Sequence, residues 1–218
     1  MEKRILAINK DTVIDWLLNK HYAKRIPSIS FSFGCFVDGI LKGVITYGSP
    51  PSPTLCIGVC GEQWKKNVYE LNRLTMEDGH DKNLSSYFVS NSMKLLPKPS
   101  IIVSFADTKM DHVGYIYQAT NFIYTGLTTK RNNWSEIGTN KHHKTVTTEY
   151  SLEERRSNPS KFEMVQRSQK HRYIYFLGNK KQVKELYKDL NYEIQPYPKG
   201  ESKKYKNDKK VAKQMTFI

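Results

Sequence analysis

Residues 101–124 read IIVSFADTKMDHVGYIYQATNFIY, and this stretch gives the clearest indication of how the chain folds. Residues 101–105 form a short apolar run, which is typical of a buried strand. Asp111 can cap a helix that we expect to run to Thr120, and Asn121 suits the left-handed position that follows a helix. Residues 122–124 then predict a further strand.

The flanking sequence adds more strands and helices. Towards the N-terminus we expect strands at 5–8, 29–36, 44–47 and 68–74, a helix that Thr12 caps, and a second helix that Asn83 caps and Pro97 ends. Asp38-Gly39 predicts a hairpin turn between two of the strands, and residues 48–61 are expected to be a turn-rich, glycine-containing loop. Towards the C-terminus we expect a strand at 172–176 and a basic helix at 180–190. This order mixes hairpins with crossovers, so it predicts an α+β fold rather than a doubly wound parallel sheet.

The length and charge of the chain suggest one domain with a basic extension. The chain has 218 residues and a net charge of +14. Residues 1–128 carry 14 Lys+Arg against 11 Asp+Glu, a net of +3, whereas residues 129–218 carry 21 against 10, a net of +11. We therefore expect a single domain over 1–198, with a variable polar insertion at 129–170, a basic strand-helix extension at 171–198 and a lysine-rich tail at 199–218.

Several protein classes are excluded by composition. No stretch approaches the ~18 apolar residues of a membrane span, the N-terminus lacks a secretory signal, and three cysteines are too few for a disulfide scaffold. We expect a soluble cytoplasmic protein with no membrane partner. The basic, tyrosine-rich C-terminal third predicts DNA as the partner, since lysines hold phosphates and aromatic rings stack on bases. A merely solvated surface is the alternative. The candidate DNA-binding residues are Lys170, Arg172, Lys180, Lys181, Lys184, Lys203 and Lys204.

Several stretches resemble known families. The element order resembles the GNAT acyltransferase fold, and Tyr117–Phe122 looks like its Tyr-x-x-x-Gly-Phe signature with Asn in place of Gly. Over residues 19–200 the chain resembles a narrower group, the phage Mom-like adenine-modification proteins. The matching stretches are 19–25 (NKHYAKR), 47–53 (YGSPPSP), 56–61 (CIGVCG), 68–74 (VYELNRL), 85–88 (SSYF), 106–108 (ADT), 113–126 (VGYIYQATNFIYTG) and 170–176 (KHRYIYF).

The resemblance implies a GNAT-like mixed, mostly antiparallel sheet flanked by helices, and a transferase activity. It implies that the protein converts adenine N6 in DNA to an N6-carbamoylmethyl form, which shields phage DNA from host restriction. The alternatives are an ordinary GNAT N-acetyltransferase and a non-catalytic DNA-binding antirestriction protein. A third alternative is an amino-methyltransferase. Ser49-Pro50-Pro51-Ser52 is similar to the motif with which that family holds a flipped base, although its last residue is not aromatic.

The donor site departs from the GNAT pattern. GNAT proteins hold the pyrophosphate of coenzyme A with a glycine-rich loop at a helix N-terminus. Residues 78–86 contain one glycine and two acids, although Ser85 and Ser86 still open the helix and are candidate donor-binding residues. Acyl-coenzyme A and an aminoacyl-tRNA therefore both stay open as donors, and tRNA is a possible second partner.

The candidate catalytic residues are Asp107, Tyr117, His21 and Arg73. Asp107 follows a buried strand, where desolvation would raise its pKa to suit a base, or where it caps a turn. Tyr117 matches the family position for a general acid and is a candidate acid or orienting hydroxyl, and Tyr115 is a donor- or substrate-binding candidate. The two lie two residues apart on one helix, so one is expected to face the site and the other to pack in the core, and which does which stays open. Arg73 is either a phosphate or substrate clamp or a salt-bridge partner, and alternation on its strand puts it on the face opposite Glu70.

Two further groups come from the loops. His21 and Tyr22 end the first helix, and the resemblance implies that this region borders the acceptor cleft; a simple helix cap is the alternative for His21. Cys56 and Cys60 form a Cys-x3-Cys pair, but a metal site usually needs three or four ligands and no histidine lies at a diagnostic spacing. We expect no metal and a pair of half-buried thiols.

Overall fold

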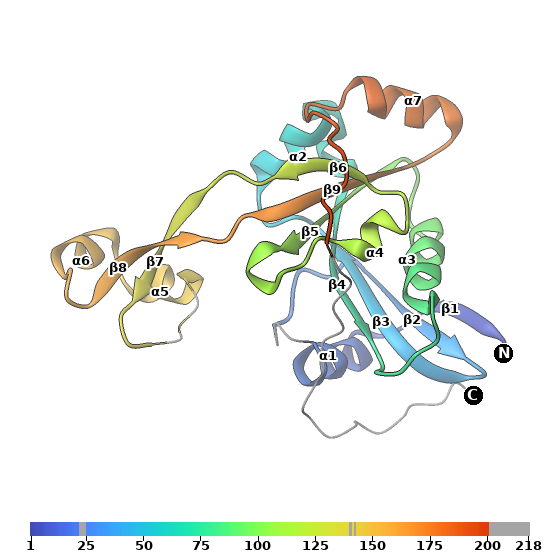
Figure 1. The fold of residues 1–218 in the computed structure, drawn as a ribbon, viewed down its shortest axis with the longest axis horizontal. Helices are drawn as coiled ribbons and strands as arrows, with labels where there is room; N and C mark the ends of the chain where they lie inside the picture. The colour runs from blue at the N-terminus through green and yellow to red at the C-terminus, as the bar shows by residue number, and fades with distance from the viewer. Residues whose placement is uncertain (22–24, 140, 142, 201–218) are drawn as a thin grey trace.

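A computed structural model describes residues 1–21, 25–139, 141 and 143–200. Its body is a seven-stranded sheet in the order β1-β2-β3-β4-β5-β9-β6 (Figure 1). All neighbouring strands are antiparallel except β4 and β5, so the expected α+β class with a mixed, mostly antiparallel sheet is confirmed. The strands are β1 (Lys3–Ala7), β2 (Phe31–Val37), β3 (Ile40–Gly48), β4 (Val68–Met76), β5 (Ser100–Asp107), β6 (Ile123–Leu127) and β9 (Lys170–Leu177).

Helices cover both faces of this sheet. One face, here called the α1–α2 face, packs against α1 (Lys10–Asn19), α2 (Pro53–Cys60) and α7 (Lys180–Lys188). The other, the α3–α4 face, packs against α3 (Leu84–Lys94) and the single turn α4 (Tyr115–Gln118). Two 3-10 turns, Glu62–Asn67 and Thr108–Met110, precede β4 and follow β5. Of the helices in the described ranges, none is both long and apolar enough to cross a membrane.

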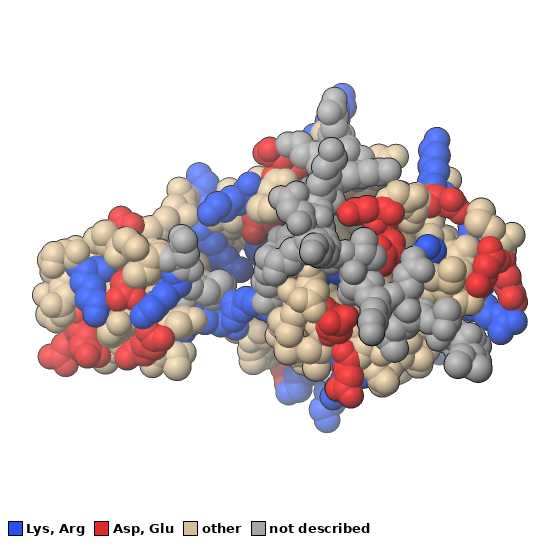
Figure 2. Space-filling view, turned by 90° about the horizontal axis from the view of Figure 1, so that it is seen from below, with Lys and Arg blue, Asp and Glu red and all other residues tan. Residues whose placement is uncertain are grey.

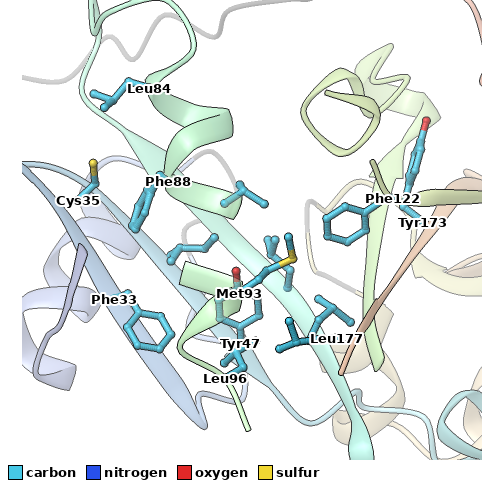
Figure 3. Close-up of a cluster of buried hydrophobic side chains, with 14 of the residues drawn as sticks. Phe33, Cys35, Tyr47, Leu84, Phe88, Met93, Leu96, Phe122, Tyr173 and Leu177 are labelled. Atoms are coloured by element: carbon cyan, nitrogen blue, oxygen red, sulfur yellow. The ribbon is translucent and has the colours of Figure 1, made fainter. Parts of the chain in front are cut away.

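The largest hydrophobic cluster lies on the α3–α4 face. Phe33 and Tyr47 from the sheet and Phe88 and Met93 from α3 point into it (Figure 3). The hydroxyl of Tyr47 is fully buried and hydrogen-bonds with Ser92 Oγ at 2.8 Å, so this packed cluster holds a satisfied polar pair. The cluster fixes α3 against the strands and so fixes the strand ends that carry the candidate site.

Three local predictions were wrong, each for an identifiable reason. α1 begins earlier than expected because Asn9, not Thr12, caps it: Thr12 N donates to Asn9 Oδ1 at 2.9 Å. The expected loop at 48–61 contains α2, because Ser52 caps a helix and Pro53 suits its first position. Asp111 adopts a left-handed conformation (φ 51°) and caps no helix, so only one turn forms before Asn121, whose predicted left-handed conformation is confirmed (φ 60°).

The polar segment at 129–170, for which the sequence predicted no helix or strand, contains an arm that projects from the body (Figure 1). The arm is a two-stranded ribbon, β7 (Arg131–Glu136) and β8 (Phe162–Arg167), with α5 (His143–Glu149) and α6 (Leu152–Ser157) between the strands. Val146 and Phe162 are buried in a small core of the arm's own.

The hairpin at Asp38-Gly39 is confirmed, with both residues at positive φ (48° and 80°) as a type I′ turn requires.

Candidate active site

The parallel strands β4 and β5 separate at their carboxyl ends. They pair only where residues 68–70 face residues 101–103, yet β4 continues to Met76 and β5 to Asp107. Such a divergence leaves the ends of two central strands without a neighbouring strand on the side where they face each other. In sheets containing parallel strands, ligands commonly bind beyond such carboxyl ends.

A bulge in β4 decides which side chains meet there. Thr46 pairs with Arg73 and Tyr47 with Leu71, so Asn72 is an extra residue opposite no partner. Its side chain accepts from Thr46 Oγ1 at 2.5 Å and donates to Ser28 O at 2.8 Å, which holds the bulge in place. The extra residue reverses the alternation of the strand. Glu70 and Arg73 therefore share the α1–α2 face, and the prediction that they lie on opposite faces was wrong.

Five ionisable side chains meet on this face, and we call them the polar cluster. They come from the end of α1, from β4, from the end of β5 and from the start of β9. They are His21, Glu70, Arg73, Asp107 and Lys170. Gly48, which pairs with Glu70, helps this packing, because a Cβ there would lie 1.9 Å from Ser28 O.

Glu70 has the properties of a proton acceptor. Burial raises the pKa of this half-buried carboxyl above its usual value, against the lowering effects of Lys170, Arg73 and Lys144. A carboxylate whose pKa is raised by burial is a better base near neutral pH than an exposed one. The positive charges of Lys170, Arg73 and Lys144 offset only part of this rise in the pKa of Glu70.

His21 and Arg73 lie together beside Glu70. His21 is only 7% exposed, and burial, with the charge of Arg73, lowers its pKa to about 4, so the imidazole is neutral near pH 7. Arg73 donates to Asn72 O at 2.6 Å and to Arg25 O at 3.4 Å, contacts that tie its guanidinium to the bulge and to the segment after α1. The structure thus brings His21 and Arg73 within electrostatic reach of each other. Tyr22 lies outside the described residues.

Asp107 is held by hydrogen bonds and has little basicity. Its Oδ1 accepts from Ser168 Oγ at 2.7 Å and from Lys109 N at 3.0 Å, and Lys170 Nζ lies 3.6 Å from its Oδ2. Burial alone would raise the pKa of Asp107, but these partners outweigh it and lower the pKa. The expected rise was therefore wrong. Asp107 caps the turn that follows β5 and orients Lys170, its neighbour in the strand register.

The two tyrosine candidates are not in the polar cluster. Tyr117 packs on the α3–α4 face, with its ring 5.4 Å from that of Phe122 and 5.2 Å from that of Tyr173. Tyr115 is 58% exposed at the start of the same single turn. The structure separates both from the cluster by the thickness of the sheet.

The first turn of α3 does not fit the pyrophosphate of coenzyme A. His80 Nδ1 lies 2.7 Å from Glu77 O, and its Nε2 lies 2.8 Å from Ser85 Oγ, so this hydroxyl is engaged within the loop. Ser86 Oγ donates to Asn83 O. Asp78 and Asp81 are exposed beside these residues, where their charge opposes an anion. We therefore derive no step from coenzyme A.

The cysteines are packing residues in this structure. Cys60 is buried against α7 and its Sγ lies 3.7 Å from Leu186 O, and burial raises its pKa to about 12. Cys56 is partly exposed, and burial raises its pKa as well. Within the described ranges, no three His, Cys, Asp or Glu side chains come together as metal ligands.

The candidate DNA-binding residues fall in different places. Arg172 lies 3.4 Å over the ring of Tyr192 and donates to Thr125 O and Oγ1, so its donors are used inside the protein. Lys180, Lys181 and Lys184 are exposed on α7, and Lys180 and Lys184 line a shallow hollow with Tyr187. Because Leu177 pairs with Ser100 while Lys170 pairs with Asp107, α7 begins roughly 24 Å from the cluster along β9. Lys203 and Lys204 lie outside the described residues.

Sequence reasoning missed Glu70, Ser168 and the role of Lys170 beside Asp107. A carboxylate within the apolar strand at 68–74 was the available signal for Glu70. No pattern marked the bulge at Asn72, which decides the side of the sheet on which Glu70 and Arg73 lie together.

Comparison with known protein families identifies the class of protein. The chain belongs to the Mom protein family, which it matches over residues 2–199. It is 28% identical over 204 residues to the methylcarbamoylase Mom of Escherichia phage Mu, an alignment that covers 87% of this chain and 83% of that protein. The family resemblance that the sequence motifs indicated is confirmed.

Solved structures with a similar fold are acetyltransferases. A GNAT-family acetyltransferase from Bacillus cereus is 10% identical, and the match covers 81% of this chain and 98% of that one at a TM-score of 0.43. An N-acetyltransferase from Staphylococcus aureus is 13% identical, with 81% and 99% covered and a TM-score of 0.44.

Proposed function

We propose that this protein is a transferase that modifies the N6 amine of adenine in DNA with a carbamoylmethyl-type group, and that the modification protects phage DNA from restriction. The main support for this proposal is that the chain matches the Mom family over residues 2–199 and that its phage Mu relative is named a methylcarbamoylase. The polar cluster supplies groups suited to that chemistry at the open ends of β4 and β5.

The amine needs help to react because its lone pair is delocalised into the purine ring. In the proposed step, a bond forms between N6 and the carbonyl carbon of the donor while the donor's leaving group departs with its electron pair; with a glycyl donor this gives an N6-glycyl amide, an isomer of the carbamoylmethyl adduct that must then rearrange to it. One N6 proton passes to Glu70 as that bond forms. A positioned base of this kind contributes about 10²–10⁴-fold to a rate.

The other members of the cluster have supporting roles in this proposal. Arg73 and Lys170 are the cations beside Glu70, and they stabilise negative charge that develops on the donor or its leaving group. Asp107 and Ser168 position Lys170. Neutral His21 packs against Arg73 and forms the wall on the α1 side. The donor stays open between an acyl-coenzyme A and an aminoacyl-tRNA, and the geometry of the α3 turn favours the second.

Access to N6 requires an unpaired base. The amine is engaged in a base pair inside B-DNA, so the adenine must be flipped out or met in a single strand, at a cost of a few kcal/mol. A fluorescent adenine analogue at the target position should therefore brighten when the protein binds. Unchanged fluorescence at saturating protein would point to a different acceptor.

The test of the proposal is mass spectrometry of nucleosides from DNA of expressing cells. A deoxyadenosine heavier by one carbamoylmethyl group is expected, together with resistance of that DNA to some restriction enzymes. The Glu70→Gln variant is the matched control, because it is nearly isosteric and lacks the base. Unmodified DNA from the phage's natural host, with folded protein present, would contradict the proposal, and an acetylated small molecule or protein would support an ordinary N-acetyltransferase.

A further inference from the structure

The charges at the tip of the arm are used to hold the tip together. Lys141 Nζ lies 2.9 Å from Glu136 and 2.6 Å from Glu149, and Lys161 lies 4.3 Å over the ring of Tyr150. Arg155 lies over the ring of Trp134 and donates to backbone carbonyls of residues 150 and 151. Lys141, Lys161 and Arg155 therefore have partners within the tip.

The base of the arm is different. Arg131 and Arg167 are directly opposite each other in the β7–β8 register, and both are exposed. Like charges in a directly opposed pair destabilise a ribbon. Across the described part of the chain, no carboxylate lies within ion-pair distance of either guanidinium. The ribbon thus carries two adjacent, uncompensated guanidinium groups where it leaves the body.

These arginines belong to a strip of positive charge that reaches the polar cluster. His143, at the start of α5, is within electrostatic reach of Arg167, Lys144 and Arg25, and Lys144 also acts on Glu70. Lys144 and Arg25 are exposed, and Arg25 O accepts from Arg73. Figure 2 shows basic side chains gathered where the arm joins the body, whereas acidic ones lie at the far end of the arm. Lys144 and Arg25 therefore connect the basic ribbon to the polar cluster.

We propose that the base of the arm is a phosphate-binding surface, formed by Arg131, Arg167, Lys144 and Arg25, that holds the DNA backbone beside the adenine in the polar cluster. The inference rests on the proposed function and names where the DNA partner binds. It assigns backbone contact to the arm rather than to α7, whose lysines lie at the other end of β9.

The chemistry of the surface favours a phosphate chain over other anions. Exposed guanidinium groups bind phosphate oxygens in a bidentate manner, and a linear strip suits a polymer with regularly spaced charges. A two-stranded antiparallel ribbon also has the width of the DNA major groove. Phosphate contacts carry no base information, so the surface should act alike on all sequences.

The experiment measures binding of a fluorescein-labelled DNA duplex by anisotropy as a function of salt. R131A/R167A should reduce the slope of log K against log salt by about 2 and weaken binding roughly tenfold to a hundredfold at 0.1 M salt. R131K/R167K keeps both charges and should restore the slope. The matched control is K66A/K98A, which removes two exposed charges at the starts of β4 and β5, and should leave the slope near the wild-type value.

The outcomes separate this inference from the proposed function. If R131A/R167A keeps the wild-type slope while wild-type cells still contain modified adenine, the arm surface is not the DNA site and the proposed function stands. If wild-type protein neither binds duplex nor modifies adenine, the proposed function fails. If the salt slope falls equally in R131A/R167A and K66A/K98A, the net charge of the protein sets the slope rather than the arm surface, and the inference is overturned. If R131A/R167A binds labelled tRNA more weakly than the wild type does but binds the duplex equally well, the surface holds the donor and the proposal is overturned.

Discussion

The two faces of the sheet carry different chemistry. On the α1–α2 face, Glu70 lies within electrostatic reach of both Arg73 and Lys170, where β4 and β5 separate. On the α3–α4 face, Tyr117, Phe122 and Tyr173 stack in a cluster whose polar groups are satisfied internally. Tyr117 and Tyr173 thus contribute to packing, whereas the ionisable groups to which we assign the proposed reaction lie on the other face.

The largest effect should come from Glu70→Gln on the α1–α2 face. Removing the proposed base should reduce adenine modification by about 10³-fold, which corresponds to about 4 kcal/mol of barrier. The measurement is the fraction of modified deoxyadenosine in expressing cells. Tyr117→Phe, the counterpart on the α3–α4 face, should retain activity within about threefold once matched for folded protein.

This pair of variants can reverse the comparison. If Tyr117→Phe abolished modification and Glu70→Gln did not, the reactive face would be the one covered by α3 and α4. Thermal unfolding of both variants provides the control, because a lost fold would mimic a lost base.

The second effect concerns stability in acid. Burial, aided by Arg73, lowers the pKa of His21 to about 4 from the ordinary 6.5, so the unfolded chain binds this proton before the folded one does. The native state therefore loses stability as the pH falls from about 6.5 to about 4, by up to about 3 kcal/mol from this residue. Urea unfolding at pH 7, 5.5 and 4 should show a steeper loss for wild type than for His21→Gln. Equal losses would show that His21 takes up its proton at the same pH in the folded and the unfolded chain.

Much of the body could be predicted from the sequence. Apolar runs marked residues 101–105 and 172–176 correctly as strands, because strands buried on both sides consist of short apolar stretches. The hairpin at Asp38-Gly39 followed from the conformations that these residues tolerate. The length of α4 did not follow, because the left-handed conformations at 111 and 114 depend on surrounding contacts.

The candidate site was only half predictable. Arg73 was selected because a charged residue within an apolar strand rarely faces a dry core, whereas His21 and Asp107 were selected on the family resemblance. Glu70 was assigned to the wrong face relative to Arg73, because a one-residue bulge changes every later side chain of a strand without leaving a pattern in the sequence. The arm escaped assignment since its small core is built from only a few apolar residues amid polar ones.

The third effect tests the packing role of the α3–α4 face. Tyr47→Phe removes the hydroxyl that bonds Ser92 but leaves the ring, and Ser92 Oγ still bonds Val89 O at 3.0 Å. The loss should be about 1 kcal/mol of unfolding free energy, with adenine modification unchanged. Chemical denaturation measures the first and nucleoside analysis the second. Loss of modification with normal stability would bring this face into the reaction.

The smallest effect concerns the field that the arm exerts on the α1–α2 face. The charge of Lys144 lowers the pKa of Glu70, which burial raises, so Lys144→Ala should move that pKa further upward. The shift should be small, because Lys144 is exposed and solvent screens its charge. A carbon-13 NMR titration of the Glu70 carboxyl measures it directly and requires no donor. Lys180→Ala, at the far end of β9, should leave the pKa of Glu70 unchanged. If both variants shifted that pKa equally, the arm would exert no local field on Glu70, and the two faces would differ in net charge alone.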